Sequence, residues 1–158
     1  MDTVDIKILN ELAANARVTG AEIARKIHLS LPAVTERLRR LDKSGMIEQY
    51  TIRYNRDRLG LCLLAFIQVW IDHTISDEAK DYLTELPEVL ECHHIAGEYD
   101  LLLKVLVEDT DALETLLTQK IKRNRAISRT STTVVLSTYK EEINRPHYDI
   151  PRSRKTRN

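Results

Sequence analysis

In the first thirty residues, apolar side chains recur at intervals of three and four positions, which is typical of short helices. Apolar side chains recur at helical spacing over residues 3–14, which predicts an amphipathic helix there. A second helix is predicted to begin at Thr19, because Thr19 and Glu22 have the spacing of a capping box, in which each side chain bonds the other residue's amide. Residues 28–30 are then too few for anything but a tight turn.

A third helix is predicted over about residues 31–44. Ser30 is suited to cap its N-terminus, and Pro32 falls in the first turn, where amides have no intrahelical partner. Gly45 is expected to end this helix. Residues 47–54 alternate with β-branched and aromatic side chains, which indicates a strand or a wing. Two helices, a short turn and a capped third helix form the layout of a helix-turn-helix, whose second element can enter the major groove of DNA.

The second half of the chain has a different periodicity. A polar segment at residues 55–60 is expected to be a linker. Beyond it, strands and helices are predicted in the order β-α-β-β-α-β, at residues 61–71, 76–86, 89–96, 100–107, 110–122 and 126–140. This is the ferredoxin-like order, with both helices on one face of an antiparallel sheet, so the fold class is α+β. The apolar first strand suggests that another subunit covers the second face.

Charge is unevenly distributed along a chain whose formal net charge is zero. Residues 1–60 hold 11 Lys/Arg against 8 Asp/Glu, residues 61–121 hold 3 against 13, and residues 122–158 hold 10 against 3. The kind of binding partner must therefore be inferred for each segment separately, not from the net charge of the whole chain. No apolar run is long enough to span a membrane and the acidic start is unlike a secretion signal, so we expect a cytoplasmic protein. Cys62 and Cys92 are expected to be buried thiols rather than a disulfide or metal pair.

Several side chains of the second and third helices are candidates for contacting DNA. Arg37, Arg39 and Arg40 can pair with phosphates or guanine edges, and Arg25 and Lys26 could hold backbone phosphates. Near the N-terminal end of the third helix, where bases are normally read, lie Ser30, Leu31, Ala33, Thr35 and Glu36. The alternative is that these charges form only a solvated face of a helical bundle.

Five stretches, taken in order, make the chain resemble the Lrp/AsnC (feast/famine) family of bacterial and archaeal transcription regulators over residues 2–142. They are DIKILNELAANAR, LSLPAVTERLRRLDKSGMIEQY, LG before the first strand, PEVLECHHIAGEYDLLLKV and ISRTSTTVVL. The resemblance implies a winged helix-turn-helix domain at residues 1–54 that binds double-stranded DNA. It also implies a ferredoxin-like domain at residues 61–142 that binds an effector, dimerises by sheet packing and assembles into octamer-like rings. Composition, not the resemblance, predicts a basic, flexible tail at residues 143–158, with transient contact with DNA phosphates as the alternative.

The resemblance also suggests an effector site without a metal or cofactor. Gly97 to Asp100 match the family's G-x-x-D turn, and Thr130 and Thr132 match its T-x-T, placed near the same pocket. In the family this turn lies at the interface between dimers, so a small amino acid would be held there between dimers. Asp100 would accept a hydrogen bond from the ammonium group of that amino acid or from a neighbouring amide, and glycine would allow a positive φ in the turn. The alternative is an ordinary hairpin turn, and Leu101 stands where relatives usually have an aromatic residue. The candidate effector residues are Gly97, Glu98, Tyr99, Asp100, Thr130, Thr132 and Thr133.

The alternative function is enzymatic, because siroheme decarboxylases resemble this chain in having the same two-domain arrangement. In that case His93, His94 and Tyr99 would be the acid–base candidates. Adjacent histidines in a strand point to opposite faces and cannot chelate one metal together, so we interpret them as structural. Trp70 is expected to pack at an interface.

Overall fold

The chain divides into two compact units in the computed structural model, which describes residues 1–75 and 78–143. One unit contains residues 1–53 and, among the described residues, 140–143; the other contains residues 54–139. The segment predicted as a linker, residues 55–60, lies within the second unit, where Asp57–Leu59 form a 3₁₀ turn. The first two residues of the helix predicted at 76–86 and the tail at residues 144–158 lie outside the described residues.

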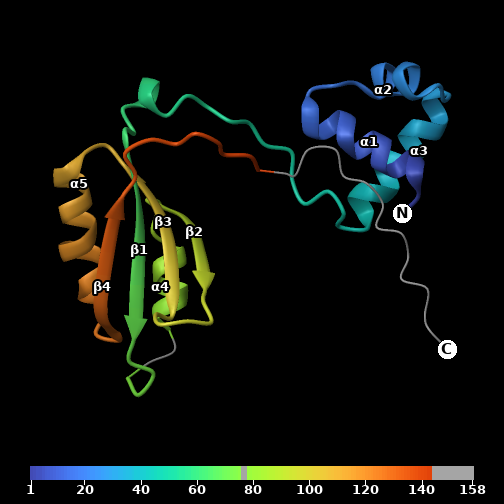
Figure 1. Cartoon of the computed structure of the whole chain (residues 1–158). Helices are drawn as coiled ribbons and strands as arrows, with labels where there is room; N and C mark the ends of the chain where they lie inside the picture. Colours follow the sequence, from blue (N-terminus) through green and yellow to red (C-terminus); the bar gives the residue numbers. More distant parts are fainter. Residues whose placement is uncertain (76–77, 144–158) are drawn as a thin grey trace. The chain divides into compact units, whose positions relative to one another are not determined.

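The first unit contains the three predicted helices: α1 (Thr3–Ala14), α2 (Gly20–Ile27) and α3 (Leu31–Lys43) (Figure 1). Each contributes apolar side chains to one small core. Its buried members are Ile8, Ile23, Ala24, Val34 and Leu41. The helical spacing seen in the sequence therefore corresponds to the faces that pack together.

The predicted ends of these helices are confirmed. The Thr19 hydroxyl accepts the Glu22 amide at 3.2 Å and the Glu22 carboxylate accepts the Thr19 amide at 2.8 Å. Ser30 Oγ accepts the amide of Ala33 at 3.4 Å. At the end of α3, Gly45 takes a φ of 70°, which side chains with a Cβ rarely adopt.

The prediction of a strand at residues 47–54 is wrong. These residues form neither helix nor strand. A strand needs a partner for its backbone hydrogen bonds, and no residue of the described chain forms a ladder with this segment. Instead, Arg53 donates through Nη1 to the carbonyl oxygen of Glu141 at 2.6 Å and pairs through Nη2 with its carboxylate at 3.1 Å.

The second unit confirms the ferredoxin-like topology. A four-stranded sheet has the order β2-β3-β1-β4 with every neighbouring pair antiparallel. The elements are β1 (Leu63–Ile71), α4 (Ala79–Thr84), β2 (Val89–His94), β3 (Leu101–Val107), α5 (Thr110–Thr115) and β4 (Ile127–Val134) (Figure 1). After α5 the chain continues as a π-helical turn and a 3₁₀ turn, Leu116–Lys120 and Ile121–Arg123.

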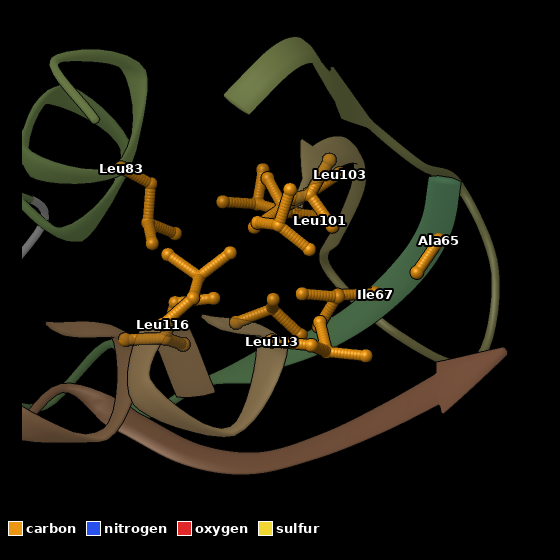
Figure 2. Packing of buried hydrophobic residues seen from close by; sticks show 11 residues of the cluster. Ala65, Ile67, Leu83, Leu101, Leu103, Leu113 and Leu116 are labelled. Carbon is orange, nitrogen blue, oxygen red and sulfur yellow. The ribbon is translucent and has the colours of Figure 1, made fainter. Parts of the chain in front are cut away.

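Both helices cover the same face of this sheet, as predicted. Figure 2 shows Leu83 of α4 and Leu113 of α5 pointing toward Ile67 and Leu103 on the strands. The alternating residues of the central strands point to the other face. They include Leu64, Phe66 and Leu102, which are only partly buried. Neither α4 nor α5 covers that face, although Leu106, opposite Leu64 at one end of it, is buried.

Two further sequence predictions are corrected by this unit. The last strand ends at Val134 rather than at residue 140, because its partner β1 begins at Leu63 and offers nothing beyond the bond from the Val135 amide to Leu64. Cys62 is exposed because it precedes the sheet, and Cys92 is half-buried, so they are not two buried thiols. Among residues 1–75 and 78–143, no helix has the length and apolarity needed to cross a membrane.

Candidate nucleic-acid interface and ligand turn

The N-terminal half of α3 carries exposed side chains on the first unit. Ser30, Leu31, Thr35 and Glu36 are exposed, whereas Ala33 is half-buried. The Ser30 hydroxyl caps the helix, and the Thr35 hydroxyl donates to the carbonyl of Leu31 at 2.9 Å. Ser30 and Thr35 oxygens can still accept hydrogen bonds, and the Leu31 side chain and the Thr35 methyl are apolar surface.

All three arginines of α3 are engaged in ion pairs within the unit. Arg39 forms a two-point contact with Glu36, with Nε and Nη2 at 3.0 and 2.6 Å from its oxygens. Arg37 Nη1 lies 2.7 Å from a carboxylate oxygen of both Asp2 and Asp5. Arg40 Nη2 donates to both oxygens of Asp5, at 2.9 Å each. The prediction that these arginines contact DNA stays a prediction, and Arg37 has the least exposed side chain of the three.

Asp5 is the important residue that our sequence analysis missed. Its side chain is 1% exposed, and with Asp2 it forms a capping box that begins α1. Burial raises the pKa of Asp5, but the Asp2 amide and the Arg37 guanidinium lower it more, so the pKa lies below its ordinary value. The Asp5 amide and the Arg37 guanidinium lower the pKa of Asp2 to about 2. The i, i+3 spacing of these acids, which matches that of Thr19 and Glu22, was the available signal.

The two cations at the end of α2 have different surroundings. Lys26 pairs with Glu11 of α1. Arg25 is exposed, and it has no ion-pair partner in the described part of the chain. Glu22, one turn earlier in α2, interacts electrostatically with Arg25 without forming an ion pair, so the guanidinium of Arg25 is more accessible to another anion than the paired ammonium of Lys26.

In the second unit, Asp100 is bound to the end of β1. One of its oxygens accepts the Ile71 amide at 2.7 Å, and the other lies 3.2 Å from Nε2 of His73. The Asp100 amide in turn donates to the carbonyl of Val69 at 3.0 Å. The pKa of Asp100 lies below its ordinary value because of the Ile71 amide and then His73. Asp100 thus accepts from a backbone amide, one of its two predicted partners, and its bond to an ammonium group stays a prediction.

The structure brings together only some of the predicted effector residues. Thr130 pairs with Val69, and Thr132 pairs with Ile67, so both lie on the helix-covered face of β4, beside the strand that holds Asp100. Thr133 pairs with Phe66 and points to the opposite face. Gly97 does not take the predicted positive φ, which among the described residues occurs only at His28, Gly45 and Gly60.

An aromatic cluster adjoins the turn on the uncovered face. Trp70 packs edge-on against Tyr99, with ring centroids 5.8 Å apart, and the Arg129 guanidinium lies 4.5 Å from the centre of the Trp70 ring. The prediction that Trp70 packs at an interface between subunits stays a prediction. His93 pairs with Glu91 at 3.1 Å. No group of three potential metal ligands occurs in the part of the chain that the structure describes.

Comparisons with known proteins agree with both units. A model described as the Lrp/AsnC ligand binding domain matches residues 64–144, and a winged helix-turn-helix DNA-binding model matches residues 1–48. The leucine-responsive regulatory protein of Escherichia coli (strain K12) is 33% identical over 144 residues, which cover 89% of this chain and 88% of that protein.

Solved structures of regulators are also similar over almost the whole chain. A transcriptional regulator from Neisseria meningitidis in complex with L-Met has a TM-score of 0.85 and 29% identity, covering 92% of this chain and 96% of its own. A feast or famine regulatory protein from M. tuberculosis complexed with L-methionine has a TM-score of 0.86 and 35% identity, covering 92% and 99%. None of these three relatives is named as an enzyme, so they give the decarboxylase alternative no support.

Proposed function

The chain belongs to the Lrp/AsnC family of transcription regulators, and from this premise we propose how its two units divide the work of an amino-acid-responsive regulator. It is a DNA-binding transcription regulator with a ligand-binding domain of the family type. In our proposal α3 reads operator DNA and the 54–139 unit senses the effector. A regulator that binds chromosomal DNA would be located in the cytoplasm.

The exposed N-terminal half of α3 is the observation that carries the DNA-binding proposal. In a helix-turn-helix, this end of the second helix meets base edges in the major groove. Leu31, Ala33 and the methyl group of Thr35 offer apolar contact to thymine methyl groups, and Ser30 and Glu36 can accept hydrogen bonds from bases. Phosphates would be held by the basic side chains of α2 and α3, namely Arg25, Lys26, Arg39 and Arg40.

The turn from Gly97 to Asp100 is our candidate for the effector site, and Thr130 and Thr132 lie on the helix-covered face of β4, across β1 from the Asp100 strand. Two similar structures are complexes with L-methionine, which supports an apolar amino acid as the effector here. Because Asp100 already accepts the Ile71 amide, we assign it to holding the turn in shape rather than to binding the ammonium group. Glu98 and Tyr99 would then contact the ligand.

We also propose that the uncovered sheet face is closed by a second copy of the chain. Leu64 and Phe66 of β1 point to that face, and so does Leu102 of β3, which lies opposite Gln68 and next to the Phe66–Lys104 pair. Apolar side chains gathered on one sheet face are stabilised when another layer excludes water from them. Two copies would present two α3 helices, as symmetric operators require. The octamer-like ring implied by the resemblance stays a prediction.

The first test is a titration of the full chain with labelled duplexes from the region around its own gene, at two salt concentrations. We expect sequence-specific binding that weakens with salt by about 0.9 log units per log unit for each phosphate contacted. Leucine and methionine should shift the affinity if the second unit senses an apolar amino acid. Arg25→Ala should reduce the salt slope by about 1.

A matched control is Lys80→Ala, which removes the same charge from the exposed face of α4 in the other unit. It should leave the salt slope unchanged. Absence of binding to every duplex at low salt would sink the DNA-binding proposal. If the chain binds DNA but no amino acid changes its affinity, only the proposal that the second unit senses an amino acid would be rejected.

A further inference from the structure

The contacts of Asp5 suggest a role beyond capping α1. We infer that Asp5 is a positioning residue for DNA binding: it holds the Arg40 guanidinium in place so that the remaining N–H groups of Arg40 can bind a DNA phosphate. This inference rests on the proposed DNA binding by α3. In this inference Arg40 contacts the DNA phosphate, whereas Arg37 links α1 to α3 within the unit.

The carboxylate of Asp5 has no capacity for further hydrogen bonds. One oxygen accepts from Arg37 Nη1 and Arg40 Nη2, and the other accepts from Arg40 Nη2 and the Asp2 amide, all at 2.7 to 2.9 Å. A carboxylate offers about four acceptor positions, and four are filled here. Because the side chain is also buried, Asp5 has a single orientation, and it fixes the guanidinium that contacts it.

Arg40 is the partner that remains able to bind something else. Its side chain is 58% exposed, and only Nη2 contacts Asp5. Among the residues that the structure describes, the Nε and Nη1 groups of Arg40 have no hydrogen-bond partner. An oriented guanidinium edge with unused N–H groups suits a phosphate oxygen, and less entropy is lost when the side chain is held in advance.

Arg37 has a different position. Its side chain is 26% exposed, and Nη1 is shared between Asp2 and Asp5 at the start of α1. Releasing it to DNA would leave the buried Asp5 with fewer partners, which is unfavourable for a buried charge. The same carboxylate therefore holds one arginine inside the unit and presents the other at its surface.

The test compares the DNA affinities of Asp5→Asn, Asp2→Asn and Arg40→Ala with that of the wild-type full chain. Asp5→Asn should weaken binding by about fivefold, because coupled residues of one ion-pair network show effects of this order. Asp2→Asn is the matched control: it removes the same charge next to Arg37 but has no bond to Arg40, so it should not weaken binding. In the Arg40→Ala background, Asp5→Asn should have no further effect on affinity.

This last comparison separates positioning from stability, since loss of stability through Arg37 would persist without Arg40. Asp5→Asn that binds as well as or better than the wild type would overturn the inference, as would an undiminished effect in the Arg40→Ala background. If Asp5→Asn does not fold, Arg40→Lys gives the answer. It keeps the charge but not the guanidinium fork, so it should lose as much affinity as Arg40→Ala, and wild-type affinity would contradict us. A wild-type chain that binds no duplex is a separate outcome and rejects the proposed function itself.

Discussion

His28 is an unusual residue in the turn between α2 and α3. Its φ is 58°, in the left-handed region that costs L-residues about 1–2 kcal/mol. Glycine would relieve this strain but adds freedom to the unfolded chain, so His28→Gly should raise the free energy of unfolding by about 0.5–1 kcal/mol. Urea denaturation would show a higher midpoint with an unchanged slope.

A control for this substitution lies in α2, the helix that His28 follows. Ala21 is exposed inside α2, so Ala21→Gly should lower the free energy of unfolding by about 1 kcal/mol. The opposite signs would show that the backbone angle at His28, and not glycine itself, is responsible. Destabilisation by both substitutions would mean that the imidazole side chain contributes more than the strain costs.

At the scale of elements, the start of α1 gives the first unit a dependence on acid pH. The pKa of Asp2 is about 2 and that of Asp5 is also below its ordinary value, because both carboxylates accept amides and pair with Arg37. Groups with lowered pKa values stabilise the fold above their unfolded-state pKa, and this contribution disappears as the pH falls through the folded-state pKa. The free energy of unfolding should therefore fall between about pH 4 and pH 2.

The pH dependence is measured by urea denaturation of the wild type and of Asp2→Asn across this range. The variant should be less stable at pH 6, and its stability should change less on acidification, because asparagine has no proton to gain. Parallel curves for the two proteins would show that Asp2 is not responsible.

The elements that could be predicted are those whose signals are local. Thr19 with Glu22, Ser30 and Gly45 mark helix ends by contacts within a few residues, and all were confirmed. Residues 47–54 have a strand pattern, yet alternation alone cannot supply a partner strand. The helix predicted at residues 110–122 becomes a π-helical turn at Leu116–Lys120, a change for which we found no sequence signal.

The candidate sites were predictable only in part, because their key contacts join distant residues. Arg37 and Arg40 are 32 and 35 residues away from Asp5, so helical periodicity can place them on a face but cannot reveal the carboxylate opposite. The family's turn motif located Asp100, whereas its bond to Ile71 depends on the sheet register. That register also explains why Thr133 faces away from Thr130: consecutive strand residues alternate between the two sides.

At the scale of the whole molecule, the uncovered sheet face leads to a prediction about assembly. Phe66 lies at its centre, paired with Lys104 and Thr133 on the flanking strands. Phe66→Lys should leave the 54–139 fold intact, because Phe66 is outside the buried core, but it should convert a dimer to monomers in sedimentation equilibrium. Operator affinity should fall as well, since a monomer presents only one α3. Gln119→Lys, an exposed change on the helical side, should remain dimeric. A Phe66→Lys chain that still sediments as a dimer would show that another surface joins the copies.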